Sequence, residues 1–173
     1  MKVLTAVELA IRERRTHKQY LDEPLSREEI EELLELARWA PNHKLTQPWR
    51  FRVVGPETLA RLKEVGGPKE APKLDRAPTL VIVSAALEGD PLQDDEDVLA
   101  TGAALYAVML AAHARGLASY WRTPEVLRTA EGRAAAGLGD DERFVGIIYL
   151  GYPCSEPKAK DRDPLERSLE YLP

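Results

Sequence analysis

The chain has 173 residues, and its 24 Lys and Arg against 29 Asp and Glu give a net charge of −5 at pH 7. This length fits one domain, residues 1–173, with a sizeable core. The acidic balance and the lack of a basic stretch argue against a nucleic-acid partner, because nucleic acids attract clustered Lys and Arg. The one cysteine, Cys154, excludes an intrachain disulfide and every multi-cysteine metal site.

The N-terminal residues lack the apolar core of a signal peptide. The longest nearly apolar run, residues 102–112, is shorter than the about 20 residues that cross a bilayer. We therefore predict a cytoplasmic protein with no membrane segment.

Residues 3–14 are predicted to form a helix, because Val3, Val7 and Ile11 recur on one face. The segment Arg14-Arg15-Thr16 follows. Its two cations have two interpretations. They complement the dipole at the end of the helix, or they bind an anion such as a phosphate together with the Thr16 hydroxyl. On the residues alone, the first interpretation is the stronger.

Residues 26–37 carry the clearest helix signal in the chain. Ser26 and Glu29 form a capping box, in which each side chain bonds the backbone amide of the other. Apolar residues then recur at helical spacing, and Pro41 is expected to stop the helix.

Residues 41–51 form a connection that is rich in possible binding groups. The segment holds the only Asn of the chain, Asn42, together with His43, Gln47 and Trp49. Loops between rigid elements are where binding groups concentrate. The alternative is a polar loop that a buried tryptophan anchors.

Residues 49–54 and 79–86 are predicted strands, and the second is apolar enough to be buried on both faces. Between them, Pro56 begins a short predicted helix that ends near Val65, because proline suits the first helical position. Residues 66–76 are rich in Gly, Pro and Lys and predict an irregular loop.

Residues 88–96 are predicted to be an acidic loop, and they lack the spacing of a calcium loop. Residues 97–115 predict a long helix that is apolar on nearly all sides, which favours burial in the core or in a subunit interface. Gly116 should end this helix. No metal site is predicted.

Thr123 and Pro124 predict the start of a further helix directly after Trp121 and Arg122. A helix start beside these side chains could hold an anionic or aromatic group, or it could be an ordinary cap with a core tryptophan. Residues 144–151 predict another buried strand.

The sequence contains no nucleophile elbow, P-loop, zinc-protease helix or dinucleotide-binding glycine motif. We predict no catalytic side chain. The remaining binding groups fit a site whose difficult chemistry is supplied by a cofactor.

Several motifs in register resemble those of the nitroreductase family of flavoproteins, over nearly the whole chain. The resemblance is closest to small proteins named NAD(P)H nitroreductases. The motifs are Arg14-Arg15-Thr16, Arg38-Trp39-Ala40-Pro41, Asn42-His43-Lys44, Gln47-Pro48-Trp49-Arg50-Phe51 and Tyr120-Trp121-Arg122-Thr123.

The resemblance implies an α+β fold with a mostly antiparallel central sheet, flanked by helices, in an intertwined homodimer. It implies an FMN-dependent NAD(P)H oxidoreductase that passes hydride through the flavin to nitro compounds, quinones or similar electrophiles. Two alternatives remain: a flavin carrier or sensor without turnover, and a family offshoot that dehydrogenates another substrate.

The resemblance also assigns the FMN-binding residues. Those at the phosphate and ribityl end are Arg14, Arg15, Thr16 and Arg162. Those that contact the flavin are Trp39, His43, Gln47, Trp121, Arg122 and Thr123, of which Trp39 and His43 are expected to reach the FMN of the other subunit. Residues 111–116 match a stretch associated with the nicotinamide nucleotide.

Overall fold

The structure, a computed structural model, describes residues 3–173. Four strands form one antiparallel sheet in the order β1-β2-β4-β3. The strands are β1 (Trp49–Val53), β2 (Thr79–Ala86), β3 (Ala118–Arg122) and β4 (Glu142–Gly151). This sheet with its flanking helices confirms the predicted α+β fold. The central strands β2 and β4 are the two that the continuous apolar runs predicted as buried.

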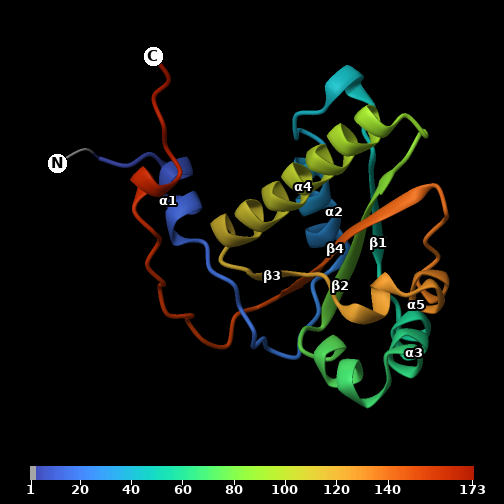
Figure 1. The fold of residues 1–173 in the computed structure, drawn as a ribbon. Coiled ribbons are helices and arrows are strands. Elements are labelled where there is room, and N and C mark those ends of the chain that lie inside the picture. Colours follow the sequence, from blue (N-terminus) through green and yellow to red (C-terminus); the bar gives the residue numbers. More distant parts are fainter. Residues whose placement is uncertain (1–2) are drawn as a thin grey trace.

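Helices cover both faces of the sheet (Figure 1). On one face, α2 (Arg27–Ala37) and α4 (Pro91–Ala114) pack into one apolar core with the sheet. On the other face, α3 (Pro56–Leu74) and α5 (Ala130–Ala135) form a second core. The near-continuous apolar sequence of β2 and β4 supplies side chains to both cores, so these strands hold the two layers together.

The N-terminus of α2 has the predicted capping box. The Glu29 amide donates to Ser26 Oγ at 3.2 Å, and the Ser26 amide donates to Glu29 Oε2 at 2.8 Å. The helix ends at Ala37, four residues before Pro41. The sequence therefore predicted both the start and the extent of this helix.

The prediction of two loops is wrong, because parts of both segments are helical. In the first, residues 66–76, α3 continues to Leu74 after a kink at Gly67, whose φ is +62°. Glycine takes this left-handed conformation without strain, and Pro68 then suits the start of a new helical run. In the second, residues 88–96, α4 begins at Pro91, because the Asp90 carboxylate accepts the Gln93 amide at 2.9 Å.

The predicted helix after Thr123 is only partly correct. A short 3₁₀ helix, η2 (Glu125–Arg128), comes first, and α5 then begins with Thr129 as its N-cap. Gly132 in α5 lies against the Val126 carbonyl, where no side chain would fit. The turn between η2 and α5 therefore splits the predicted helix in two.

By length and composition alone, α4 could cross a membrane, the only such helix in residues 3–173. Ten of its residues are buried in the fold. The core of a folded protein explains this apolar helix without a bilayer.

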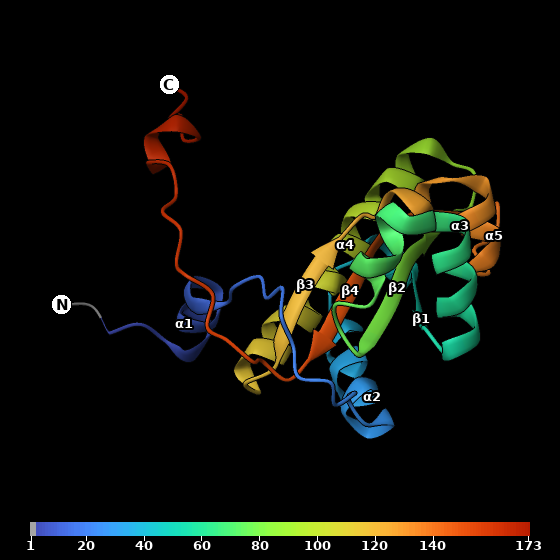
Figure 2. The same cartoon turned by 90° about the horizontal axis from the view of Figure 1, so that it is seen from below.

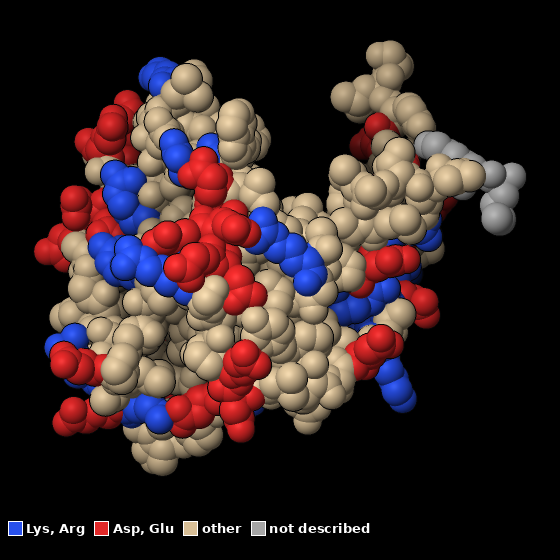
Figure 3. All heavy atoms as spheres, turned by 180° about the vertical axis from the view of Figure 1, so that it is seen from behind, with Lys and Arg blue, Asp and Glu red and all other residues tan. Residues whose placement is uncertain are grey.

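Helix α1 (Ala6–Glu13) is shorter than predicted and has no buried residue. The predicted apolar face is present but open, and the Val3 side chain is 87% exposed. The C-terminal segment lies beside α1, away from the sheet, in both Figure 1 and Figure 2. Figure 3 shows these terminal segments standing apart from the body, and acidic and basic side chains mixed over that face.

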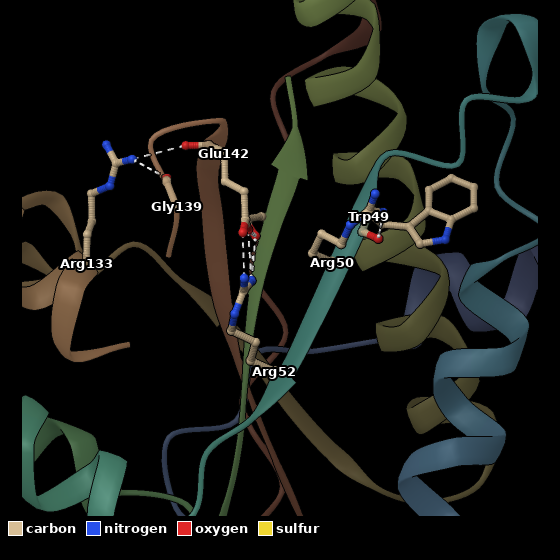
Figure 4. Close-up of polar contacts among 7 residues, drawn as sticks. Trp49, Arg50, Arg52, Arg133, Gly139 and Glu142 are labelled. Atoms are coloured by element: carbon tan, nitrogen blue, oxygen red, sulfur yellow. Dashed lines mark hydrogen bonds and ion pairs between the residues drawn. The ribbon is translucent and has the colours of Figure 1, made fainter. Parts of the chain in front are cut away.

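A polar cluster ties three strands together at one end of the sheet (Figure 4). Arg52 on β1 reaches across β2 and donates to both oxygens of Glu142 on β4, at 2.8 and 2.5 Å. The Ser84 hydroxyl, on β2 between them, also donates to Glu142. Burial by itself would raise the pKa of Glu142, but the hydrogen bonds from Arg52 and Ser84 outweigh it and lower that pKa.

Glu142→Gln is expected to lower the free energy of unfolding at pH 7 by about 1–3 kcal/mol, because Arg52 loses its charged partner. A lowered pKa means that this stabilisation is present above the unfolded-state pKa and is lost as the pH falls through the folded-state pKa. Urea unfolding at pH 7 and at pH 3 measures both. The difference between wild type and variant should shrink at pH 3; an equal difference at both pH values would contradict this account.

The matched control is Glu31→Gln, which breaks the exposed ion pair of Glu31 with Arg27 on α2. Exposed pairs of this kind contribute little to stability. The unfolding curve of this variant should stay close to that of the wild type at both pH values.

Candidate functional site

The segment after α1 lies along the edge of the sheet. Thr16 forms a parallel bridge with Ser119 of β3, and the His17 amide donates to the Ser119 carbonyl at 3.1 Å. This pairing covers part of the free edge of β3. It also fixes Arg14 and Arg15 at the junction between α1 and the sheet.

The Arg14 guanidinium has no partner within residues 3–173. Its Nε and Nη1 atoms are buried and make no hydrogen bond. A buried donor without a partner is costly, and a charged one is more so. The position therefore calls for an anionic group that the single chain does not supply.

A cavity of about 470 Å³ lies beside this segment, and four cations line it. Both ends of the chain contribute to its lining, through residues that follow α1 and residues of the C-terminal segment; we call it the basic cavity. The lining residues are Arg15, Thr16, Lys18, Gln19, Ser155, Pro157, Lys158 and Lys160. None of these is acidic, although the whole chain has a net charge of −5. The cavity suits a phosphate group.

Sequence analysis missed Lys18, Lys158 and Lys160 as members of this basic cavity. The signal was present, because Lys158, Lys160 and Arg162 alternate along the C-terminal segment. Arg162, the residue predicted from the resemblance, does not line the cavity; its Nη1 donates to the Lys160 carbonyl at 3.1 Å.

A second cavity, of about 430 Å³, shares Arg15 with the basic cavity and contains His17 and His113. Burial lowers the pKa of His17, and the neighbouring His113 and Arg14 lower it further. Gly116 lines this cavity too, so it includes part of the stretch that the resemblance associates with a nicotinamide nucleotide.

A third cavity, also of about 430 Å³, lies along the N-terminal half of α4; we call it the α4 cavity. It is lined by Pro41, Asn42, His43, Glu96, Leu99, Ala100 and Ala103. His43 Nδ1 lies 2.6 Å from Glu96 Oε2. The small and apolar side chains of α4 leave a surface on which a flat ring could lie.

The loop of residues 42–47 is held to α4 and to itself by hydrogen bonds. Asn42 Oδ1 accepts the Gln47 amide at 2.9 Å, and Thr46 Oγ1 donates to Asp97 Oδ1 at 2.6 Å. Lys44 and Gln47 take positive φ values of 55° and 47°, which non-glycine residues rarely adopt. The loop therefore has a defined shape.

The buried Trp49 anchors this loop, as one of the two interpretations expected. The anchor does not exclude the binding interpretation, because the His43 side chain remains in the α4 cavity. The Gln47 side chain is exposed, and Trp39 is 82% exposed.

Trp121 and Arg122 project from opposite faces of β3. The Trp121 ring lies on the α4 side, 3.8 Å from where a Cβ on Gly102 would be. The Arg122 guanidinium lies on the α3 side, where Nη1 donates to the Tyr149 hydroxyl at 3.0 Å and Nη2 is 3.9 Å from Glu70 Oε2. Trp121 and the α4 cavity thus share one stretch of α4, whereas the Arg122 side chain faces away from it.

Thr123, the last residue of this motif, is exposed, and its hydroxyl accepts Arg128 Nη2 at 2.6 Å. The structure therefore brings Arg15 and Thr16 together at the basic cavity, and His43 and Trp121 near one stretch of α4. All the FMN contacts that the resemblance assigned stay predictions.

The antiparallel α+β fold carries a cation-lined cavity and, along α4, a cavity lined partly by small apolar side chains, a combination expected of a protein class that holds phosphorylated aromatic ligands. The sequence model of the Nitroreductase family matches residues 11–152. The chain belongs to this family, and the resemblance inferred from its motifs is confirmed. The matched range includes every predicted site residue except Arg162.

Relatives match the chain over nearly its full length. "Putative NAD(P)H nitroreductase YfhC" of Bacillus subtilis is 32% identical, over 90% of this chain and 88% of its own length. A nitroreductase-like protein from Bacillus cereus has a TM-score of 0.89 at 27% identity, covering 99% and 98% of the two chains. A nitroreductase-like protein from Desulfovibrio desulfuricans, solved in complex with FMN, has a TM-score of 0.85 at 28% identity, covering 99% of each chain.

Gly146→Ala is expected to displace the Trp121 indole, because the new Cβ would lie 2.1 Å from Trp121 Nε1. We expect a loss of about 1–3 kcal/mol in stability, the usual cost of overpacking, and a shift in tryptophan emission. Gly102→Ala is the matched control. Its new methyl group would meet the same indole at 3.8 Å, an ordinary contact, so the emission should not change. Equal effects of the two variants would contradict the described position of the indole.

Proposed function

We propose that the chain is an FMN-dependent NAD(P)H oxidoreductase that acts as a cytoplasmic homodimer, with residues 1–173 as one FMN-binding domain. The observation that carries the proposal is the Arg14 guanidinium, whose buried Nε and Nη1 have no partner, directly before Arg15 and Thr16 in the sequence, which line the cavity with four cations. In a chain with a net charge of −5, such a group is best explained by a bound anion. An FMN complex of a family relative supports FMN as that anion.

The phosphate of FMN fits the basic cavity. Arg14 and Arg15 would donate from their guanidinium groups, and Thr16 from its hydroxyl. Lys158 and Lys160 would add charge from the C-terminal segment, and Arg162 lies two residues further along the chain. Together these groups would neutralise a dianion that the overall field of the protein repels.

The flavin ring fits the surface of α4 between His43 and Trp121. This surface offers apolar contact to the face of the ring, and His43 offers a polar group to its edge. When bound, FMN supplies the hydride chemistry. The residues of this chain bind and orient it, and we propose no catalytic side chain among them.

The homodimer is supported by apolar surface that a single chain leaves open. Helix α1 has no buried residue, and Leu99 and Tyr106 are exposed on α4. The C-terminal segment adds the exposed side chains of Leu165, Leu169, Tyr171 and Leu172. Exposed apolar side chains on several elements favour an interaction with a second chain. A second copy would cover it and would bring the exposed Trp39 to the flavin of its partner.

The electron donor and acceptor are proposed from the relatives. The B. subtilis relative is named as an NAD(P)H nitroreductase. We propose NAD(P)H as donor, and nitro compounds, quinones or similar electrophiles as acceptors.

Anaerobic addition of NADH or NADPH to the FMN-loaded protein should bleach the flavin absorbance. A quinone or a nitroarene added next should restore it. A stopped-flow absorbance record measures both steps. If neither nucleotide bleaches a flavin that dithionite does reduce, the protein is a flavin carrier or sensor and the proposed reaction is wrong.

Arg14→Ala is expected to weaken FMN binding by about 10- to 100-fold, the range for losing hydrogen bonds to a charged group. Riboflavin lacks the phosphate, so its affinity should change little. Fluorescence titration of both flavins gives the ratio of the two dissociation constants. An unchanged ratio would remove Arg14 from the phosphate site.

Lys69→Ala is the control for the loss of one positive charge. Lys69 lies on α3 and pairs with Glu125, on the other face of the sheet from the α4 cavity. Its replacement should leave the affinities for FMN and riboflavin close to those of the wild type.

A further inference from the structure

Within the α4 cavity, Glu96 holds the imidazole of His43. The 2.6 Å contact joins His43 Nδ1 to an oxygen of the Glu96 carboxylate. An ionised carboxylate only accepts hydrogen bonds, so Nδ1 carries the hydrogen in this contact. In the neutral ring the other nitrogen, Nε2, is then an acceptor without a hydrogen.

We propose that Glu96 is a positioning residue that acts through His43. It fixes the imidazole as the Nδ1–H tautomer and leaves Nε2 as the nitrogen that meets the flavin. The proposal rests on the proposed function for the identity of the ligand, whereas the state of the ring is a property of the protein alone.

The position of Glu96 on α4 suits this role. Glu96, Leu99, Ala100 and Ala103 follow one another at helical spacing, so they share one face of the helix. The residue that orients the imidazole and the residues that form the apolar surface therefore belong to one rigid element. A group held by such an element keeps its geometry better than one on a free loop.

The backbone of the loop is fixed by other groups. Thr46 Oγ1 donates to Asp97 Oδ1 at 2.6 Å, and Asp97 is buried. Lys44 and Leu45, directly after His43, hold φ values of 55° and 54°. With the backbone defined in this way, the rotation and the tautomer of the His43 ring remain to be set, and Glu96 is the side chain that contacts it.

The tautomer matters because the edge of a flavin presents both hydrogen-bond donors and acceptors. If the hydrogen is on the other ring nitrogen, a donor of the imidazole faces a donor of the flavin, or an acceptor faces an acceptor. A buried polar group left unsatisfied costs more than a hydrogen bond gains. By fixing the tautomer, Glu96 would therefore determine from which donor at the edge of the flavin His43 Nε2 can accept a hydrogen bond.

The tautomer can be measured without flavin, on the ¹⁵N-labelled full-length protein, from imidazole ¹⁵N–¹H correlations at pH 8.5. This pH lies well above the ordinary histidine pKa of about 6.5. His43→Gln assigns the His43 signals among the three histidines of the chain. We expect the wild-type ring to carry its hydrogen on Nδ1, and Glu96→Ala to exchange between both tautomers.

Thr46→Val is the control, because it breaks the other contact between this loop and α4 and does not touch the imidazole. It should keep the wild-type tautomer. A wild-type ring with its hydrogen on Nε2, or an unchanged tautomer in Glu96→Ala, would overturn the proposal. The same loss of the tautomer in Thr46→Val would also overturn it, because the position of the loop, and not Glu96, would then set the ring.

A double-mutant cycle on FMN affinity tests the link to the cofactor. Glu96→Ala should weaken FMN binding about threefold to tenfold, the range for one hydrogen bond, and should cause no further loss in a His43→Gln background. Additive losses would show that Glu96 acts independently of His43 and would overturn the positioning role. A wild-type protein that binds no FMN would instead overturn the proposed function, and the tautomer measurement would still decide what Glu96 does to the imidazole.

Discussion

The close packing of α4 on the sheet is the constraint on which the rest of the structure depends. One side of the helix is buried against β2 and α2 through small and apolar residues such as Ala104, Leu105 and Val108. The other side remains open and carries the α4 cavity. Because both sides belong to one rigid helix, the core fixes the position of the surface that the site uses. The carboxylates of Glu96 and Asp97 then attach the loop of residues 42–47 to the same helix.

The second part of the candidate site, the basic cavity, depends on the distribution of charge in the chain. The chain is acidic overall, yet cations from both of its ends meet around one cavity. Arg14, directly before Arg15 in the sequence, does not line this cavity, and its Nε and Nη1 are buried without a partner. A fold does not keep such a group unless something offsets the cost of its burial. Arg52 with Glu142 and Arg122 with Tyr149 lie elsewhere and serve the fold. Arg15 has a mixed position, because it lines the cavity while its Nη1 donates to the carbonyls of Arg12 and Arg14 at the end of α1, as the helix-end interpretation expected.

Sequence patterns were reliable where one local cause determined the outcome. The capping box of Ser26 and Glu29 gave the start of α2, and the apolar runs gave the two buried strands. They were unreliable where composition pointed to a loop and tertiary contacts favoured a helix. Gly67 and Pro68 looked like loop residues, but they mark a kink between two helical runs, and Asp90 caps α4 within a stretch that looked only acidic. Resemblance to a family predicted binding segments, but it could not show which face of β3 each side chain takes.

By itself, the sequence determined helix α2, the two buried strands, the family, and the residue types available for an anion and a flat ring, because spacing and chemistry of this kind are local properties. Only the tertiary structure decided which cations gather in one cavity. Lys158 and Lys160 meet Arg15 there because the chain folds back on itself. It also decided that Trp121 faces α4 while Arg122 faces α3, because strand alternation separates neighbouring side chains and only the packed helices give each face its environment.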